Sequence, residues 1–330
     1  MDFKNGFIKT KKLFMRFWRS ENGKVSLVRD VFIAFLFVFI ILLALWGYTG
    51  QWFGAPMVAI ESGSMMHDNE PYGRIGTINA GDMVLLVKVD GKDDIHPYIT
   101  SEYENYGKYG DVVVYKPDGN ENADQIIHRA MCWVEVYYED GVKKYTFEGT
   151  DYEDINATEP VYLKGLGLWD PSDDSAVNVS WFTHSGFITK GDNPNTNEKC
   201  DQIGGISRQP VKVEWISGKA SGELPWIGTI NLFFNDIISG KNTLGNVPGD
   251  CLQCLVILIV VLVSIPVGLD IVSYYKGKKK KKPVKPYKTS SYNDISIEKK
   301  IDNKETSSSY KEISIEEKID NKLSERFGKK

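Results

Sequence analysis

Three kinds of side chain that together perform acyl transfer occur in this chain. Ser64 lies in the segment Ser62–Met65, His128 follows two isoleucines, and Asp192 and Asp201 lie farther downstream. A serine hydroxyl is a weak nucleophile until a base accepts its proton, and a carboxylate orients that base. Imidazole is neutral near pH 7 and serves as such a base without a large pKa shift. These residue types predict a serine nucleophile, a histidine base and an aspartate.

Each of these residues also has an ordinary structural interpretation. A Ser-Gly-Ser segment is more often a plain loop, a histidine at a strand end is more often structural, and an aspartate after a strand often forms an Asx turn. Three other histidines compete for the role of base: His67, His96 and His184. No motif surrounds His96 or His184. His67 is only three residues from Ser64 and stays an alternative.

Two apolar segments are long enough to cross a bilayer, which requires about twenty residues. We expect them at residues 31–48 and 251–273. Basic residues crowd before the first segment, and a lysine run, Lys278–Lys282, follows the second. Because basic flanks stay cytoplasmic, residues 1–30 and 274–330 are predicted inside and residues 49–250 outside. A cleaved signal peptide is the alternative for the first segment, but its apolar run is long for one.

The charge distribution supports this division. Residues 48–250 contain 31 acidic and 15 basic residues, a net charge of −16, whereas the remainder contains 13 acidic and 25 basic residues, a net charge of +12. A domain with a charge of −16 repels phosphates, so a nucleic-acid partner is not expected.

The outer region is predicted to be a mainly β extracytoplasmic domain, in which no helical period dominates. Alternating or β-branched runs indicate strands, and Glu139–Val142 indicates a hairpin turn. The expected strands are residues 83–89, 111–115, 130–138, 144–147, 186–189 and 211–216.

The four cysteines are too few for a disulfide framework. Cys132 and Cys200 could pair, but their separation permits no inference. Cys251 and Cys254 form a Cys-x-x-Cys motif that opens an apolar run without a second ligand pair, which favours packing at the membrane edge over a metal site. Neither a helical His-Glu-x-x-His nor a phosphate loop is present, so no metal or cofactor is predicted.

Three further features lie outside the predicted site. The tail contains an 18-residue repeat (291–304 and 309–322), whose sparse isoleucines predict disorder. Aromatic residues among lysines in residues 7–18 suit either an interfacial helix or a solvated extension. Asn156 and Asn178 begin two candidate glycosylation sequons.

Together these segments resemble type I signal peptidases of the archaeal and endoplasmic-reticulum kind. The resemblance extends from about Phe37 to Leu232. It rests on Ser62–Met65, Gly81-Asp82, Ile127–Arg129, Ile188–Asn193 with Asp201, and Pro225–Gly228.

The resemblance implies a β-rich domain in which Ser64 is the nucleophile, His128 is the base, and Asp192 or Asp201 completes the site. Ser62 would join the Ser64 backbone N–H in an oxyanion hole, with Met65 beside the substrate. The substrate would lie extended against a strand edge, with small side chains at the residue before the cut and two earlier. The implied partners are signal-peptide-bearing preproteins, membrane lipid and a secretion translocon.

The chain departs from the family pattern at several places. His67 replaces the proline usually found three positions after the nucleophile, and residues 66–80 and 192–201 are longer than usual. The stretch Tyr138–Phe187 looks like an insertion.

We therefore expect a multi-pass protein of the cell membrane that acts as a serine endopeptidase on signal peptides. Ser64 lies about 18 residues past Trp46, within strand reach of the outer bilayer surface. One alternative is a surface binding or scaffold module that lost catalysis, and another is a peptidase for one dedicated precursor. A group of apolar residues suits either the membrane interface or the core: Leu224, Trp226, Ile227, Leu232, Phe233 and Phe234.

Overall fold

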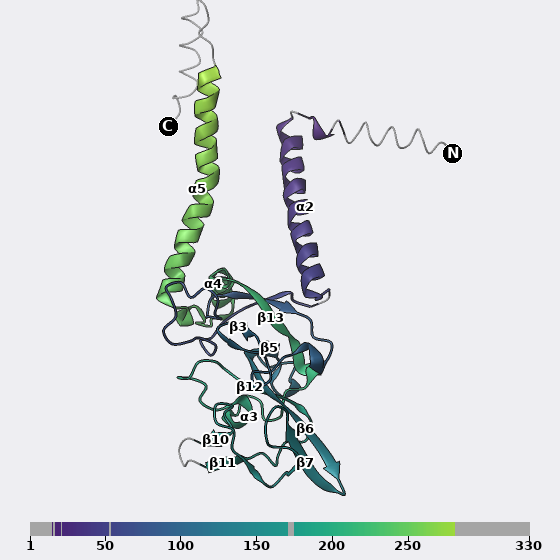
Figure 1. Ribbon diagram of the computed structural model, residues 1–330. Helices are drawn as coiled ribbons and strands as arrows, with labels where there is room; N and C mark the ends of the chain where they lie inside the picture. Colours follow the sequence, from purple (N-terminus) through teal and green to yellow (C-terminus); the bar gives the residue numbers. More distant parts are fainter. Residues whose placement is uncertain (1–14, 16, 21, 53, 171–174, 281–330) are drawn as a thin grey trace, which may run out of the picture. The chain divides into compact units, whose positions relative to one another are not determined.

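A computed structural model describes residues 15, 17–20, 22–52, 54–170 and 175–280. The protein is mainly β-sheet, with one long apolar helix before the sheets and another after them (Figure 1). These helices are α2 (Gly23–Thr49) and α5 (Gly249–Lys280), and both are long and apolar enough to cross a membrane, since 18-residue windows within them have mean hydropathies of 2.7 and 2.9. The repeat tail and the segment 7–14 lie outside the described residues.

Both helices extend beyond the apolar runs that predicted them. α2 begins at Gly23 because the Asn22 side chain accepts a hydrogen bond from the backbone N–H of Lys24 at 3.0 Å. It ends at Gly50, whose left-handed backbone (φ 68°) closes the last turn onto Trp46. Hydropathy therefore located the apolar part of the helix, while the caps set its ends.

An eight-stranded antiparallel sheet forms the centre of the body (Figure 1). Its order is β1-β2-β13-β5-β6-β7-β8, and β12 also pairs with β6. The bounds are β1 Met57–Ala59, β2 Met83–Val87, β5 Val112–Tyr115, β6 Ile126–Glu139, β7 Val142–Phe147, β8 Ile155–Asn156, β12 Gly186–Lys190 and β13 Ile216–Leu224.

Smaller elements complete the body. Strands β3 (Glu104–Asn105) and β4 (Lys108–Tyr109) form a hairpin, and β9 (Pro160–Val161), β10 (Trp169–Asp170) and β11 (Ser175–Asn178) form a three-stranded sheet. The short helices are α3 (Asp201–Gly204), α4 (Gly228–Ser239) and the 3₁₀ turns Lys92–Asp94, Pro117–Gly119, Val213–Trp215 and Leu244–Asn246.

Five of the six predicted strands are confirmed, with small shifts at their ends. The predicted strand 211–216 is wrong, because Val211 makes only a single bridge to Phe187 and residues 213–215 form a 3₁₀ turn. The strand in this part of the chain is β13, which fills the place between β2 and β5.

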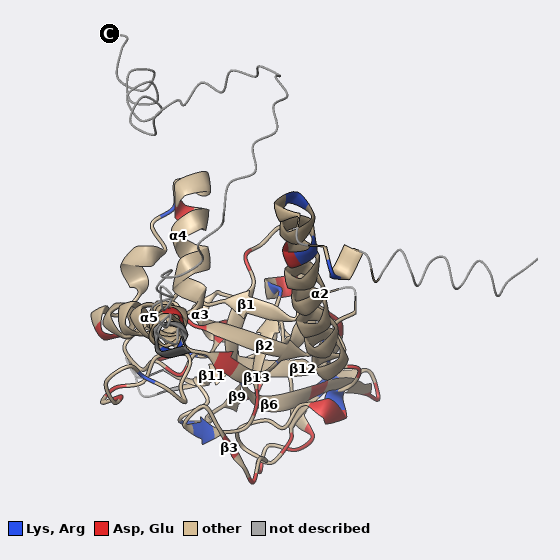
Figure 2. Cartoon of the chain, turned by 90° about the horizontal axis from the view of Figure 1, so that it is seen from above, with Lys and Arg blue, Asp and Glu red and all other residues tan. Residues whose placement is uncertain are grey.

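Helix α4 is a helical segment that the sequence did not predict, in a region that is otherwise mainly β as expected. Its Leu232 is fully buried beside Val247 and Cys251, so the helix is fixed to the body on one side. Cys251 is buried in this cluster, and packing at the membrane edge stays a prediction. Most other apolar side chains of α4 are exposed: Ile230, Phe233, Phe234, Ile237 and Ile238. Figure 2 shows α4 as almost free of charge, with Asp236 its only charged residue.

The stretch Tyr138–Phe187 contributes to a hydrophobic core of its own. Phe147, Val161, Leu168 and Phe182 are fully buried together there, next to the sheet residues Cys132 and Ile188. Cys132 and Cys200 both lie in this core as free thiols. The insertion therefore folds as a packed extension of the sheet.

Gly167 should be far less tolerant of substitution than Gly165. Both have a left-handed backbone, at φ 81° and 87°, so alanine is strained at either position. A Cβ on Gly167 would lie 2.0 Å from the backbone nitrogen of Cys200, whereas nothing lies within 4 Å of one on Gly165. We expect Gly167→Ala to lower the free energy of unfolding by about 1–3 kcal/mol more than Gly165→Ala. Thermal unfolding of both variants measures this, and equal midpoints would contradict it.

Asp82 should make stability depend on pH. Burial raises the pKa of its carboxyl to about 6, although hydrogen bonds from the backbone N–H groups of Trp226 and Asn79 oppose the rise. The folded state holds this proton more tightly than the unfolded chain does. The stability that the protonated Asp82 carboxyl contributes is therefore fully present below about pH 4 and is lost as pH rises to about 6. Unfolding midpoints measured between pH 4 and 7 should fall in the natural protein. Asp82→Asn should be less stable but should show a smaller fall, because the Glu223 carboxyl, whose pKa burial raises to about 7, still contributes to it. An identical slope would refute the assignment.

Candidate active site

Ser64 lies in the loop between β1 and β2, and we call residues 62–68 the serine loop. The loop turns where the backbone N–H of Met66 donates to the Gly63 carbonyl at 3.1 Å. The Ser62 and Ser64 hydroxyl oxygens are 3.3 Å apart, within hydrogen-bond reach of one another. Ser62 therefore places a second hydroxyl beside that of Ser64.

His128 lies near the start of β6 and is held by Asp201. Its Nδ1 is 2.8 Å from both carboxylate oxygens of Asp201, which begins α3, and both side chains are buried. The Tyr115 hydroxyl, from β5, donates to the same carboxylate at 2.6 Å. Tyr115 thus helps to fix the Asp201 carboxylate, and this carboxylate fixes the His128 ring. Nε2 forms no hydrogen bond to any described residue and stays free for a proton transfer.

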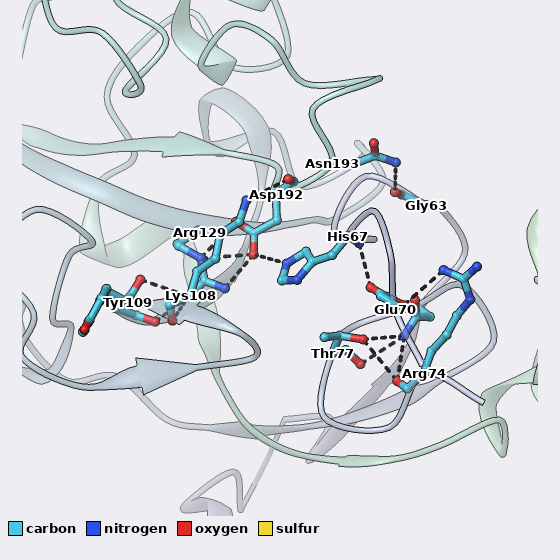
Figure 3. Close-up of polar contacts among 12 residues, drawn as sticks. Gly63, His67, Glu70, Arg74, Thr77, Lys108, Tyr109, Arg129, Asp192 and Asn193 are labelled. Atoms are coloured by element: carbon cyan, nitrogen blue, oxygen red, sulfur yellow. Dashed lines mark hydrogen bonds and ion pairs between the residues drawn. The ribbon is translucent and has the colours of Figure 1, made fainter. Parts of the chain in front are cut away.

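Asp192 has different partners. It accepts hydrogen bonds from Arg129 Nε at 2.9 Å and Nη2 at 2.6 Å, and it lies 3.1 Å from His67 Nε2 (Figure 3). Burial raises the pKa of Asp192, but the hydrogen bonds from His67 and Arg129 outweigh it and lower the pKa to about 2. Of the two acids that the sequence left open, Asp201 contacts His128 and Asp192 does not.

The alternation of side chains along β6 explains why the two acids have different partners. His128 and Arg129 are consecutive residues of one strand, and successive side chains of a strand point to opposite faces. The imidazole therefore reaches the acid on one face, and the guanidinium reaches the acid on the other.

Ser64 and His128 line the same cavity, which has a volume of about 510 Å³. Its walls come mainly from β1, the following residues up to Ser64, and the start of β6. The lining is mixed, with the apolar residues Val58, Ala59, Ile60, Val114, Ile126, Ile127 and Ile206 beside the polar residues Glu61, Ser62, Asp124, Gln125, Thr196 and Asn197. Within the described residues β1 pairs only with β2, so its other edge is free. An extended peptide can add to such an edge while its side chains enter an adjoining pocket.

Met65 and the other three histidines do not line this cavity. Met65 is 1% exposed and packs in the core with Ile60 and Ile78, so the expectation that it borders the substrate is not supported. His96 and His184 do not line the cavity, and neither does His67.

Tyr115 is the member of this cluster that the sequence did not reveal. It ends the apolar run Val112–Tyr115, and in such a run a tyrosine looks like one more core residue. Its hydroxyl is buried against Asp201, and burial is the main reason why its pKa rises well above the ordinary value. The only signal available was a polar tip at the end of an otherwise purely aliphatic strand.

In comparisons with known proteins, no family model and no curated protein matches this chain. Among the residues that the structure describes, no group of three or more histidine, cysteine or acidic side chains is placed to hold a metal ion.

Proposed function

We propose that the protein is a membrane-anchored serine endopeptidase that removes signal peptides from exported proteins. The observation that carries this proposal is the buried His128–Asp201 pair, whose histidine lines the same cavity as Ser64. A scaffold that had lost catalysis would have no need of a buried imidazole oriented by a carboxylate that is itself held by a second hydrogen bond, from Tyr115. The pair therefore favours a catalytic protein over that alternative.

In the proposed reaction the Ser64 hydroxyl attacks the scissile carbonyl while His128 Nε2 takes its proton. The developing oxyanion is stabilised by the Ser62 hydroxyl and the Ser64 backbone N–H. His128 then gives the proton to the departing amine, which leaves an ester on Ser64. Water attacks this ester with His128 again as base, releasing the peptide acid and restoring the hydroxyl. Asp201 stays ionised and keeps Nδ1 protonated throughout.

The membrane arrangement supports the choice of substrate. In the proposed topology α2 and α5 span the bilayer, both termini are cytoplasmic, and residues 49–250 lie outside. The exposed apolar residues of α4 would enter the interface, as amphipathic helices do. A signal peptide cut at this surface would still have its apolar segment in the bilayer, while its cleavage site lies extended along β1.

Activity-based labelling tests the proposal directly. A fluorophosphonate probe should label the purified full-length protein in detergent micelles, and Ser64→Ala should remove the label. Ser62→Ala keeps the nucleophile and should still label, but more slowly. Absence of label on the natural protein, or label that persists in Ser64→Ala, would refute the assignment. Co-expression with several different precursors then separates a general signal peptidase from one dedicated to a single substrate.

A further inference from the structure

The serine loop is fastened to the loop that follows β12 (residues 191–195, here the acid loop). The backbone N–H of Asn193 donates to the Ser64 carbonyl at 2.9 Å, and its side-chain amide donates to the Gly63 carbonyl at 2.8 Å (Figure 3). Asn195 adds a hydrogen bond to Asp68 at 3.1 Å. These contacts hold both ends of the serine loop, so the position of the nucleophile depends on the acid loop.

His67 supplies a further contact between the serine loop and the acid loop, and its ring is held on several sides. Its Nε2 lies 3.1 Å from Asp192 Oδ2, and its backbone N–H donates to Glu70 Oε1 at 2.6 Å. The ring also packs on the bare backbone of Gly107, where a Cβ would lie 3.0 Å from the ring carbon Cε1. With its side chain only 15% exposed, the imidazole has little freedom to leave Asp192.

Charged groups surround the contact between His67 and Asp192. Asp192 faces the ring directly, Glu70 faces its backbone, and both are anionic acceptors. Opposing them, Arg129 bonds to Asp192 from the other side and Lys108 Nζ lies 3.8 Å from the same carboxylate. A hydrogen bond to an ionised acceptor is about twice as strong as a neutral one, so the contact with the Asp192 carboxylate should hold the ring in place.

His67 itself is not placed to be the base. It lies outside the cavity that Ser64 and His128 share, and the carboxylate it contacts is already occupied by Arg129. Its contacts join the serine loop to a buried ion pair, so any effect on the reaction passes through the position of that loop.

We propose that His67 is a positioning residue, whose bond to Asp192 fixes the serine loop and thereby holds Ser64 within reach of His128. This inference rests on the proposed function. The family that the sequence resembles usually has a proline at this position, and proline fixes the backbone angle φ. Here Glu70 accepts a hydrogen bond from the His67 backbone N–H, which proline lacks, so the two solutions are not interchangeable.

The rate of Ser64 labelling by a fluorophosphonate probe, measured on the full-length protein in micelles, tests this role. His67→Ala should label about tenfold more slowly, since it removes a charge-assisted hydrogen bond. His67→Gln retains a donor at similar reach and should recover most of the rate. His184→Gln, a histidine outside the site, is the matched control and should label like the natural protein.

The glutamine variant separates a hydrogen-bonded contact from simple packing. His67→Gln labelling as slowly as His67→Ala would contradict the role of the hydrogen bond to Asp192, and His67→Ala labelling at the natural rate would overturn the positioning role. Complete loss of labelling in His67→Gln would also overturn it, because it would identify His67 as the base.

Hydrogen exchange keeps this inference separate from the proposed function. If the natural protein is not labelled at all, the peptidase proposal fails, but the fastening can still be measured. Backbone amides of residues 63–68 should exchange faster in His67→Ala than in the natural protein and His184→Gln. Unchanged exchange in these residues would refute the fastening whatever the chemistry of the site.

Discussion

Asp201→Asn is expected to lower the rate of precursor cleavage by about 10³–10⁴-fold with little change in substrate affinity. The carboxylate accepts a hydrogen bond from His128 Nδ1 and another from the Tyr115 hydroxyl. An asparagine that satisfies Tyr115 with its oxygen must turn its amide towards His128. The ring then carries its proton on Nε2 and cannot accept one from Ser64. Single-turnover cleavage of a precursor separates this loss from a loss of binding.

Asp192→Asn is the matched control, because it makes the same chemical change in the other acid. Asp192 contacts Arg129 and His67 and not His128, so the tautomer of the base is unaffected. We expect a smaller loss of rate, accompanied by a lower unfolding temperature. A loss in Asp192→Asn as large as in Asp201→Asn, at unchanged stability, would mean that the acids have been assigned the wrong way round.

Arg129→Met should cause the largest loss of stability among single substitutions in this region. The guanidinium is fully buried, and besides Asp192 it donates to the Gly110 carbonyl at 2.6 Å. Methionine fills similar space but leaves the Asp192 carboxylate buried with its main counter-charge removed. Breaking a buried pair in this way costs about 3–5 kcal/mol, which corresponds to roughly 10 °C in the unfolding temperature of a domain of this size.

An exposed ion pair provides the comparison for Arg129. Lys144 pairs with Glu139 at the end of the β6–β7 hairpin, where solvent screens the charges. Lys144→Met should leave the unfolding temperature unchanged when both variants are followed by thermal unfolding in the same detergent. Similar midpoints for the two variants would show that the Arg129–Asp192 pair is not the stabilising contact argued here.

Local patterns predicted much of the fold because they reflect local physics. The strands Met83–Val87 and Val112–Tyr115 are β-branched or aliphatic runs, and both apolar helices were visible from hydropathy. β13 was missed since it contains two glycines, an alanine and two serines, residues with weak strand preference. It is a strand because β2 and β5 lie on either side of it, and sequence pattern does not report such neighbours.

The site followed the same rule. Ser64 and His128 could be proposed from residue type and order, and they line one cavity. Which acid meets the imidazole depends on the face of β6 from which each side chain projects and on where α3 begins. Both depend on the tertiary structure, so the sequence alone could not decide whether Asp192 or Asp201 contacts His128. Met65 was misjudged for a similar reason, since adjacency to a nucleophile does not show which way a side chain points.

The first turn of α5 has a practical consequence for work on a water-soluble fragment. The Asp250 carboxylate accepts hydrogen bonds from the Gly73 backbone and Arg74, and the Tyr72 hydroxyl donates to Gln253. Arg74 in turn pairs with Glu70, the residue that receives the His67 backbone N–H. A truncation placed ahead of Gly249 would therefore remove Asp250, the last residue in a series of side-chain contacts that leads back to the serine loop. A cut beyond Cys254 would discard most of the apolar helix α5 while keeping these contacts.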